Sequence, residues 1–164
     1  MSLDSAHVLD HIVVPALNWL DMDSPSARAL LMGTAAQESL LRYLVQRRGP
    51  AVGLFQMEPE TFYDIFETYL RYRPALLSMV NSVRVTDGHE ELIWNARLAA
   101  MMARLRYRRD PFPLPSADDV QALGEYWKRV YNTEEGKGTV KEFVRNFALV
   151  RDALKNNKQE QKHV

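Results

Sequence analysis

Apolar residues recur every three or four positions along most of the chain, which is the spacing that gathers them on one face of an α-helix. The longest such pattern begins at Ser24, whose hydroxyl suits a helix cap and which is followed by a proline suited to the first helical turn. It continues to Arg48, where a Gly-Pro pair ends it. We therefore expect one helix over residues 25–48.

The same spacing predicts three further helices, over residues 58–70, 74–82 and 89–107. Two more helices are expected to begin at capping boxes, in which a hydroxyl and an acid three residues later satisfy free backbone amides. These boxes start at Ser116 and Thr139, and the helices that they open should end near Tyr131 and Leu154.

Three segments lack helical periodicity. Residues 49–57, GPAVGLFQM, place glycines around short apolar side chains, which favours an irregular segment or a small hairpin. Residues 110–116, DPFPLPS, form a proline-stiffened connector, and residues 156–164 form a polar C-terminal tail that we expect to be frayed. No alternating pattern is long enough for a large sheet, so the predicted fold class is all-α or mostly α.

The composition favours one compact domain. The chain has 164 residues, of which 46% are hydrophobic, and we place a single domain at residues 1–155. Lys+Arg and Asp+Glu both number 21, so the formal net charge is zero and provides no overall field that would attract nucleic acid or an anionic membrane. The chain has no cysteine, which excludes disulfides and thiol chemistry.

The N-terminal segment does not match a signal peptide. It carries acids where a signal peptide needs lysine or arginine, and Pro15 interrupts its longest apolar run. No stretch approaches the roughly 20 apolar residues that are needed to cross a bilayer. We therefore expect a protein without a signal peptide or membrane span, made in the cytoplasm.

A single acid stands within the apolar arc of the helix predicted over residues 25–48. At about 100° of rotation per residue, Glu38 falls among the leucines at positions 30, 31 and 41 and the valine at position 45. The ordinary interpretation is an acid at a helix boundary, either exposed or paired with Arg42 one turn later. The motifs that follow Glu38 in the chain favour a different interpretation.

Three short motifs occur in order: QES at residues 37–39, GLFQMEPET at residues 53–61 and VYN at residues 130–132. In this order and at these approximate spacings, they resemble the motifs of the lysozyme-like superfamily, specifically the soluble lytic transglycosylases and the related goose-type lysozymes. The resemblance spans about residues 27–135. It implies a lysozyme-like helical domain that cleaves peptidoglycan and needs no cofactor.

Glycoside cleavage explains why an acid would stand among apolar residues. The leaving oxygen of a β-1,4 bond must be protonated, so the acid must still hold its proton near neutral pH, which a solvated glutamate does not. Burial raises the pKa of a carboxyl group because it disfavours the charged form. The resemblance implies that Glu38 acts first as acid and then as base, and that the substrate itself closes a 1,6-anhydromuramic product.

The resemblance also implies roles for four more residues. Ser39 would orient the Glu38 carboxyl or contact an N-acetyl group, and Gln56 would line the sugar cleft with an amide suited to hydrogen bonds. Tyr131 would hydrogen-bond Glu38 and hold it in place, and Asn132 would complete the substrate-binding set. The alternatives are a helix-surface serine at position 39, a core aromatic at 131 and a helix cap at 132.

Departures from the family pattern leave the strength of glycan binding open. The family usually has a glycine soon after Ala-Tyr-Asn, whereas here the glycines follow only at positions 136 and 138. Residues 50–52, PAV, replace the customary Gly-Ala before the central motif, and phenylalanine replaces methionine at position 55. These changes are compatible with a scaffold that binds glycan poorly.

Two other groups have simpler explanations. His7 and His11 stand one helical turn apart, but no third ligand has a recognisable spacing, so we expect no metal site. Residues 103–112, ARLRYRRDPF, are basic with interleaved aromatics, as in some nucleic-acid contacts. Cations that favour a helix C-terminus, followed by a proline stop, explain them better. We therefore expect no nucleic-acid partner.

A cell-wall enzyme without a signal peptide needs a delivery route. Bacteriophage proteins have one, either inside the virion or through a pore at lysis. We interpret the chain as a phage or prophage enzyme that cleaves MurNAc–GlcNAc bonds at the bacterial wall, with peptidoglycan glycan strands as partner and other virion proteins as further candidates. The alternatives are a virion structural or interaction protein that keeps the scaffold without turnover, and a muramidase that hydrolyses the same bond.

Overall fold

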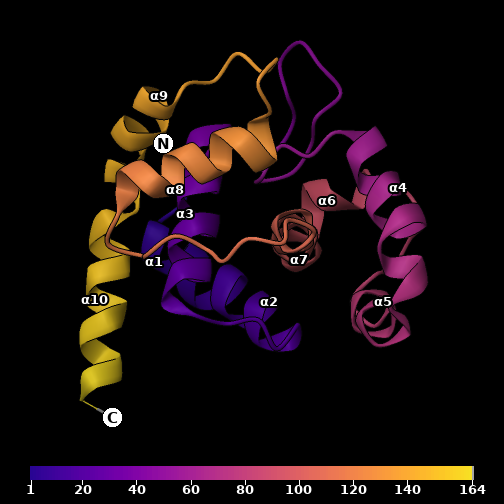
Figure 1. Cartoon of the computed structure of the whole chain (residues 1–164), viewed down its shortest axis with the longest axis horizontal. Coiled ribbons are helices and arrows are strands. Elements are labelled where there is room, and N and C mark those ends of the chain that lie inside the picture. The colour runs from indigo at the N-terminus through magenta and orange to yellow at the C-terminus, as the bar shows by residue number, and fades with distance from the viewer. Residues whose placement is uncertain (164) are drawn as a thin grey trace.

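The computed structural model describes residues 1–163, which are built almost entirely of helices (Figure 1). β structure in this range is limited to isolated bridges that pair Val52 with Val45 and with Met57. The predicted all-α class is therefore confirmed. In chain order the elements are α1 (Ser5–Val8), η1 (Leu9–Val13), α2 (Val14–Trp19), α3 (Pro25–Ser39), α4 (Pro59–Thr68), η2 (Leu70–Tyr72), α5 (Pro74–Asn81), α6 (Glu91–Trp94), α7 (Ala96–Arg108), α8 (Val120–Trp127), η3 (Lys128–Asn132), α9 (Val140–Asn146), η4 (Phe147–Leu149) and α10 (Arg151–Lys162).

The core is organised around α3 and α7. Every residue from Ala27 to Ala36 is buried, so α3 is enclosed on nearly all sides, as expected for a helix of mostly apolar and small residues. Residues Leu98–Leu105 of α7 are also all buried, and Figure 1 shows α7 end-on in the middle of the molecule. Helices α4 and α6 contact α7 on one side of this view, and α2 and α3 contact it on the other.

The helix that begins after Ser24 ends at Ser39 rather than near Arg48. Leu40 and Leu41 both have left-handed backbone conformations, with φ of 54° and 52°, which a right-handed helix cannot continue through. Leu41 is still buried, because the chain directs its side chain into the core after the helix has stopped. The apolar spacing therefore extends beyond the helix and made the predicted helix too long.

The helix predicted over residues 89–107 is broken at Asn95. The backbone leaves the helical region there, and the Asn95 side chain caps α7 by accepting a hydrogen bond from the amide of Leu98. The same side chain donates to the carbonyl of Val83 (3.0 Å) and to the carboxylate of Glu91 (2.7 Å). The spacing of apolar residues does not reveal an asparagine that ends one helix and caps the next, so the break could not be predicted from that spacing.

The two predicted capping boxes have different outcomes. The helix start predicted at Ser116 is three residues early, because Asp119 caps α8 by accepting from the amide of Ala122 at 2.9 Å. The box at Thr139 is confirmed, since Thr139 and Glu142 exchange the expected hydrogen bonds at the start of α9.

Two helices and one loop were predicted well. The helices predicted over residues 58–70 and 74–82 correspond to α4 and α5, and each begins with a proline in its first turn. Residues 49–57 are irregular, as expected, and contain the bridge between Val52 and Met57.

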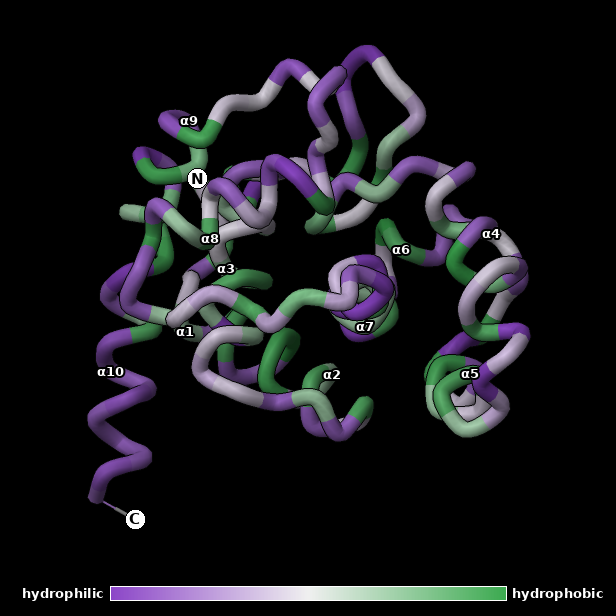
Figure 2. The backbone as a smooth tube through the Cα atoms, in the orientation of Figure 1, coloured by the Kyte–Doolittle hydropathy of each residue, from purple (hydrophilic) through white to green (hydrophobic). Residues whose placement is uncertain are grey.

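The C-terminal tail is helical rather than frayed. Helix α10 continues to Lys162 because its polar side chains find partners on the rest of the molecule. Asn157 accepts a hydrogen bond from Arg28 of α3 at 2.7 Å, and Lys158 donates to Asp118 at 2.6 Å. Figure 2 shows α10 as almost uniformly hydrophilic, so polar contacts hold most of this helix in place.

The N-terminal helical stretch of α1, η1 and α2 is continuous in spite of Pro15. The wider π-helical turn of η1 directly precedes α2, and Pro15 lies at this junction, where the change in the hydrogen-bond pattern accommodates the amide proton that proline lacks. No helix within residues 1–163 is long and apolar enough to span a membrane.

Candidate active site

Glu38 is the penultimate residue of α3, close to the point where Leu40 stops the helix. Its side chain is half-buried, and the indole nitrogen of Trp127 donates a hydrogen bond of 2.9 Å to its Oε1. Trp127 is itself completely buried at the end of α8, so this donor is held in a fixed position. Glu38 is therefore anchored at one carboxyl oxygen by a rigid neighbour.

Burial raises the pKa of Glu38 to about 7. The hydrogen bond from Trp127 and the positive charge of Arg106 both favour the carboxylate and act in the opposite direction, but desolvation outweighs them. At neutral pH the group therefore exists in both protonation states in comparable amounts. A side chain in this condition can serve as either a proton donor or a proton acceptor.

Glu38 lies in the wall of a cleft of about 620 Å³. The cleft is formed by the end of α3, the loop over residues 40–58, the start of α4, the last turn of α7, the end of η3 and the loop after it. Figure 1 shows the two loops side by side above the helices. Its lining is mostly polar and comprises Gln37, Glu38, Gln46, Ala51, Gln56, Glu58, Thr61, Arg106, Tyr131, Asn132, Thr133, Glu135, Gly136, Lys137 and Gly138.

Gln56 lines this cleft together with Glu38, as the sequence suggested. Its Nε2 donates to the carbonyl of Gly53 at 2.8 Å and to that of Tyr43 at 3.4 Å. No hydrogen bond to its Oε1 occurs within residues 1–163, so this oxygen can accept one from a ligand. The turn depends on Gly53, which has a φ of 82° and whose Cβ, if present, would lie 2.6 Å from the carbonyl oxygen of Leu92.

Tyr131 reaches the cleft but does not hold Glu38. It is only 3% exposed, and its hydroxyl donates to the carbonyl of Phe55 at 2.8 Å. The predicted hydrogen bond to Glu38 is therefore wrong, and Trp127 takes that position. Trp127 precedes Tyr131 by four residues, a spacing that places both side chains on one side of the helical segment and that could have indicated Trp127 as a second candidate.

Ser39 does not take part in the cleft. Its side chain is completely buried, and its Oγ donates to the carbonyl of Ala35 one helical turn earlier at 3.0 Å. The predicted contact with a sugar N-acetyl group is therefore wrong, and so is the alternative of a surface serine. The helical rotation of about 100° between neighbours directs Glu38 to the cleft and Ser39 into the core.

Asn132 lines the cleft and shapes its rim. Its Oδ1 accepts a hydrogen bond of 2.6 Å from Lys128, whose ammonium also donates to the carbonyl of Gly136 at 2.7 Å. The late glycines of this loop have a packing role, because a Cβ on Gly138 would lie 2.6 Å from the Trp127 ring. The absence of a side chain at Gly138 therefore lets the loop pack directly against Trp127, the residue that positions Glu38.

The structure adds residues to the site to which the sequence assigned no role. Glu58 and Thr61 from the start of α4, Arg106 from α7 and Glu135 from the rim loop all line the cleft. Arg106 also lies over the Tyr131 ring, with its guanidinium carbon 4.4 Å from the ring centre. Glu58 and Thr61 belong to the motif at residues 53–61, whereas Arg106 and Glu135 lie outside all three motifs, so only the fold links these two residues to Glu38.

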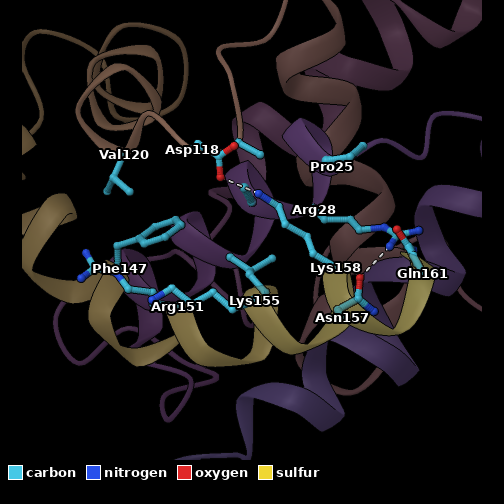
Figure 3. Close-up of a pocket in the computed structure, with 13 residues that line it drawn as sticks. Pro25, Arg28, Asp118, Val120, Phe147, Arg151, Lys155, Asn157, Lys158 and Gln161 are labelled. Carbon is cyan, nitrogen blue, oxygen red and sulfur yellow. Dashed lines mark hydrogen bonds and ion pairs between the residues drawn. The ribbon is translucent and has the colours of Figure 1, made fainter. Parts of the chain in front are cut away.

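A second pocket, of about 130 Å³, lies between α3, α8 and α10 (Figure 3). Its polar groups are largely committed to one another: Arg28 pairs with Asp23 and Asn157, and Lys158 pairs with Asp118. The pairs of Asn157 and Lys158 join α10 to the rest of the molecule, so we assign the pocket a structural role, and it offers no acid comparable to Glu38.

The two histidines noted in the sequence lie close together. The rings of His7 and His11 meet edge to face with their centres 5.5 Å apart. No group of three or more histidine, aspartate or glutamate side chains within residues 1–163 is arranged to hold a metal ion.

Comparison with models of known protein families, with curated proteins and with solved structures finds no match to this chain. Its function must therefore be inferred from the geometry of the site.

Proposed function

We propose that this chain is a lysozyme-like peptidoglycan-cleaving enzyme, a lytic transglycosylase that breaks the β-1,4 bond between MurNAc and GlcNAc with Glu38 as acid and base. The observation that carries the proposal is the position of Glu38. A carboxyl group whose pKa is raised to about 7 stands in the wall of a polar cleft of about 620 Å³. Such a group can hold a proton at neutral pH and transfer it to a bound ligand.

In the proposed reaction, protonated Glu38 gives its proton to the glycosidic oxygen as the bond from that oxygen to C1 of MurNAc breaks. The oxocarbenium-like centre is then attacked by the C6 hydroxyl of the same sugar, and the Glu38 carboxylate accepts the hydroxyl proton. The products are a free GlcNAc hydroxyl and a 1,6-anhydro end, and Glu38 returns to its starting state. The nearby charge of Arg106 favours the carboxylate in the intermediate.

The lining of the cleft supports a saccharide ligand. Sugars bind through many hydrogen bonds, and the free Oε1 of Gln56, the hydroxyl of Thr61 and the backbone of the glycine-containing rim loop lie on the walls around Glu38. Trp127 keeps the acid in one orientation, so its proton would be presented in a constant direction.

An adjoining cavity supports a substrate that carries negative charge. This cavity, of about 560 Å³, shares Gln46 and Lys137 with the cleft and is otherwise lined by Arg47 and Arg48. None of these three cations forms an ion pair within residues 1–163. Peptidoglycan strands bear peptides with free carboxylates, which neutral chitin-like glycans lack.

One observation favours hydrolysis as the second candidate reaction. Glu58 lines the same cleft as Glu38 and is exposed, so its carboxylate could direct a water molecule at C1 in place of the C6 hydroxyl. The enzyme would then be a muramidase that releases reducing ends. Exchange of Glu58 for glutamine should lower turnover for a muramidase and leave a transglycosylase nearly unchanged.

The proposal includes a phage or prophage origin, with the enzyme carried in the virion or released at lysis. The competing proposal from another class is a virion structural or interaction protein that keeps the scaffold without turnover. Both share the fold, so only an activity measurement separates them.

The test is digestion of purified peptidoglycan sacculi, followed by mass spectrometry of the released muropeptides. A transglycosylase yields anhydro ends, a muramidase yields reducing ends, and a structural protein yields neither. Glu38→Gln should lower release by at least about a hundredfold, the size expected for loss of a general acid. Glu60→Gln, an exposed residue of α4 outside the cleft lining, is the matched control and should keep wild-type activity. Full activity of Glu38→Gln would refute the assignment.

A further inference from the structure

Arg104, in the second half of α7, is a buried cation without a partner. The side chain is 8% exposed, and its Nε and Nη1 atoms are buried with no hydrogen-bond acceptor. No carboxylate within residues 1–163 forms an ion pair with it. An unpaired buried guanidinium is costly for a folded protein, so this arrangement calls for an explanation.

Arg104 lines a cavity of about 300 Å³. The cavity is open to solvent and is bounded by α7, by the proline-rich connector over residues 110–116 and by Tyr126 of α8. Arg108, one helical turn after Arg104, supplies a second cation, and Phe112 and Leu114 supply apolar wall. Aromatic and apolar walls around a few convergent charged groups are typical of sites for small organic ligands.

The acid in this cavity is already committed. The Asp110 carboxylate accepts hydrogen bonds from Arg129 (2.8 Å) and from the amide of Phe112 (3.3 Å). It is therefore not available to neutralise Arg104, and the cavity keeps an excess of positive charge. The nearby Arg106 lies on the opposite side of α7 and lines the Glu38 cleft, so the two cavities are distinct.

We propose that this cavity binds a small organic carboxylate whose body is aromatic or apolar. The carboxylate would pair with Arg104 and Arg108, and its body would pack against Tyr126, Phe112 and Leu114. The ligand carboxylate would reach Arg104 through Nη2, the guanidinium nitrogen outside the fully buried pair Nε and Nη1, and would neutralise a cation that no protein carboxylate pairs with. This inference does not depend on the activity proposed for the Glu38 cleft.

The test uses the whole chain and benzoate as probe, by isothermal titration and thermal unfolding. Benzoate should bind and raise the melting temperature, whereas benzyl alcohol, which has the same ring without the charge, should do neither. Inorganic phosphate, which has the charge without the ring, should bind more weakly than benzoate. Arg104→Met keeps most of the side-chain volume and should weaken benzoate binding at least about tenfold.

Arg97→Met is the control, because Arg97 lies exposed on the same helix away from the cavity, and it should bind benzoate as the wild type does. Arg108→Gln, at an exposed position that the fold should tolerate, gives a second test if Arg104→Met does not fold, and it should also weaken binding. Failure of the wild type to bind millimolar benzoate, equal binding by the Arg104 or Arg108 variants, or tighter binding of phosphate would each overturn the proposal.

Discussion

Glu38 differs from the other acids of the cleft in its surroundings and not in its chemical group. Glu58 and Glu135 line the same cleft but are exposed, whereas Glu38 is half-buried and has one neutral donor, Trp127, at its carboxyl oxygen. Water stabilises a carboxylate more strongly than a single indole N–H can, so the buried position favours the protonated form. This difference makes Glu38 the strongest candidate for proton transfer.

The raised pKa of Glu38 predicts how stability depends on pH. The pKa lies near 4.5 when the chain is unfolded and at about 7 when it is folded, so between these values the folded protein binds more protons. Below pH 4.5 Glu38 is protonated in both states, so its burial does not lower the free energy of unfolding. As the pH rises from 4.5 through 7, the free energy of unfolding falls, because the buried carboxyl group resists ionisation. Glu38→Gln cannot ionise and should therefore be more stable than wild type at pH 8, by up to about 3 kcal/mol.

Urea unfolding of both proteins at pH 4 and pH 8 measures this difference. The stability advantage of Glu38→Gln should appear at pH 8 and nearly vanish at pH 4. An advantage of the same size at both pH values would indicate better packing of glutamine instead of a desolvated carboxylate.

Trp127→Phe should shift the pH dependence of activity. The indole N–H lowers the pKa of Glu38, so its removal should raise that pKa further, while the ring stays in place against Gly138 and Phe143. If protonated Glu38 is required for turnover, the decline of activity above neutral pH should move to higher pH in the variant. Measuring muropeptide release from pH 5 to pH 9 tests this, and an unshifted decline would show that Trp127 does not tune the acid.

The residues of the candidate site were only partly predictable. Glu38 was visible because it breaks an apolar pattern, and Gln56 because it belongs to a short motif. The sequence indicated Tyr131 as the hydrogen-bond partner of Glu38 because Tyr131 belongs to the motif at residues 130–132. The partner in the structure, Trp127, lies outside that motif. Ser39 was misplaced because adjacent residues on a helix point in directions about 100° apart. Arg106 joins the site only through tertiary packing.

At the scale of elements, the loop over residues 40–58 carries one side of the cleft. Left-handed conformations at Leu40, Leu41, Gly53 and Gln56 turn the chain sharply, so the loop's shape depends on backbone geometry more than on side-chain burial. The spacing of apolar residues in a sequence does not indicate that a leucine will adopt a positive φ. For this reason the end of α3 and the sharp turns of the loop could not be predicted from the sequence, although the irregular character of residues 49–57 could.

Gly53→Ala should disturb this loop. The residue has a φ of 82°, and an added Cβ would lie 2.6 Å from the backbone oxygen of Leu92, which cannot move independently of α6. We expect a loss of about 1–3 kcal/mol in the free energy of unfolding, with reduced activity because Gln56 is displaced. Gly88→Ala is the control, since its Cβ would meet only the flexible Glu90 side chain. Denaturant unfolding of the two variants compares them, and equal stability would contradict the geometric interpretation.

At the scale of the whole molecule, the predictable part was the helical class and the broad order of helices. The unpredicted part was the way polar side chains join distant segments. Asn95 separates α6 from α7, and α10 is held through Asn157 and Lys158 although its outer half lacks apolar residues. Polar contacts of this kind have no period in the sequence, because their partners come from far along the chain.

The contact between Arg28 and Asn157 joins residues 129 positions apart and should contribute to global stability. Arg28 is 8% exposed, so its guanidinium cannot replace a lost acceptor with bulk water as easily as a surface arginine can. Asn157→Ala should therefore lower the free energy of unfolding by about 1–2 kcal/mol and should loosen α10.

Asn156→Ala, on the exposed side of the same helix, is the control for this prediction. It changes the same residue type without touching Arg28 and should stay within about 0.5 kcal/mol of wild type. Urea unfolding gives both values, and hydrogen exchange of the α10 amides shows whether the loss is local. Equal effects of the two substitutions would mean that α10 is held by something other than its contact with Arg28.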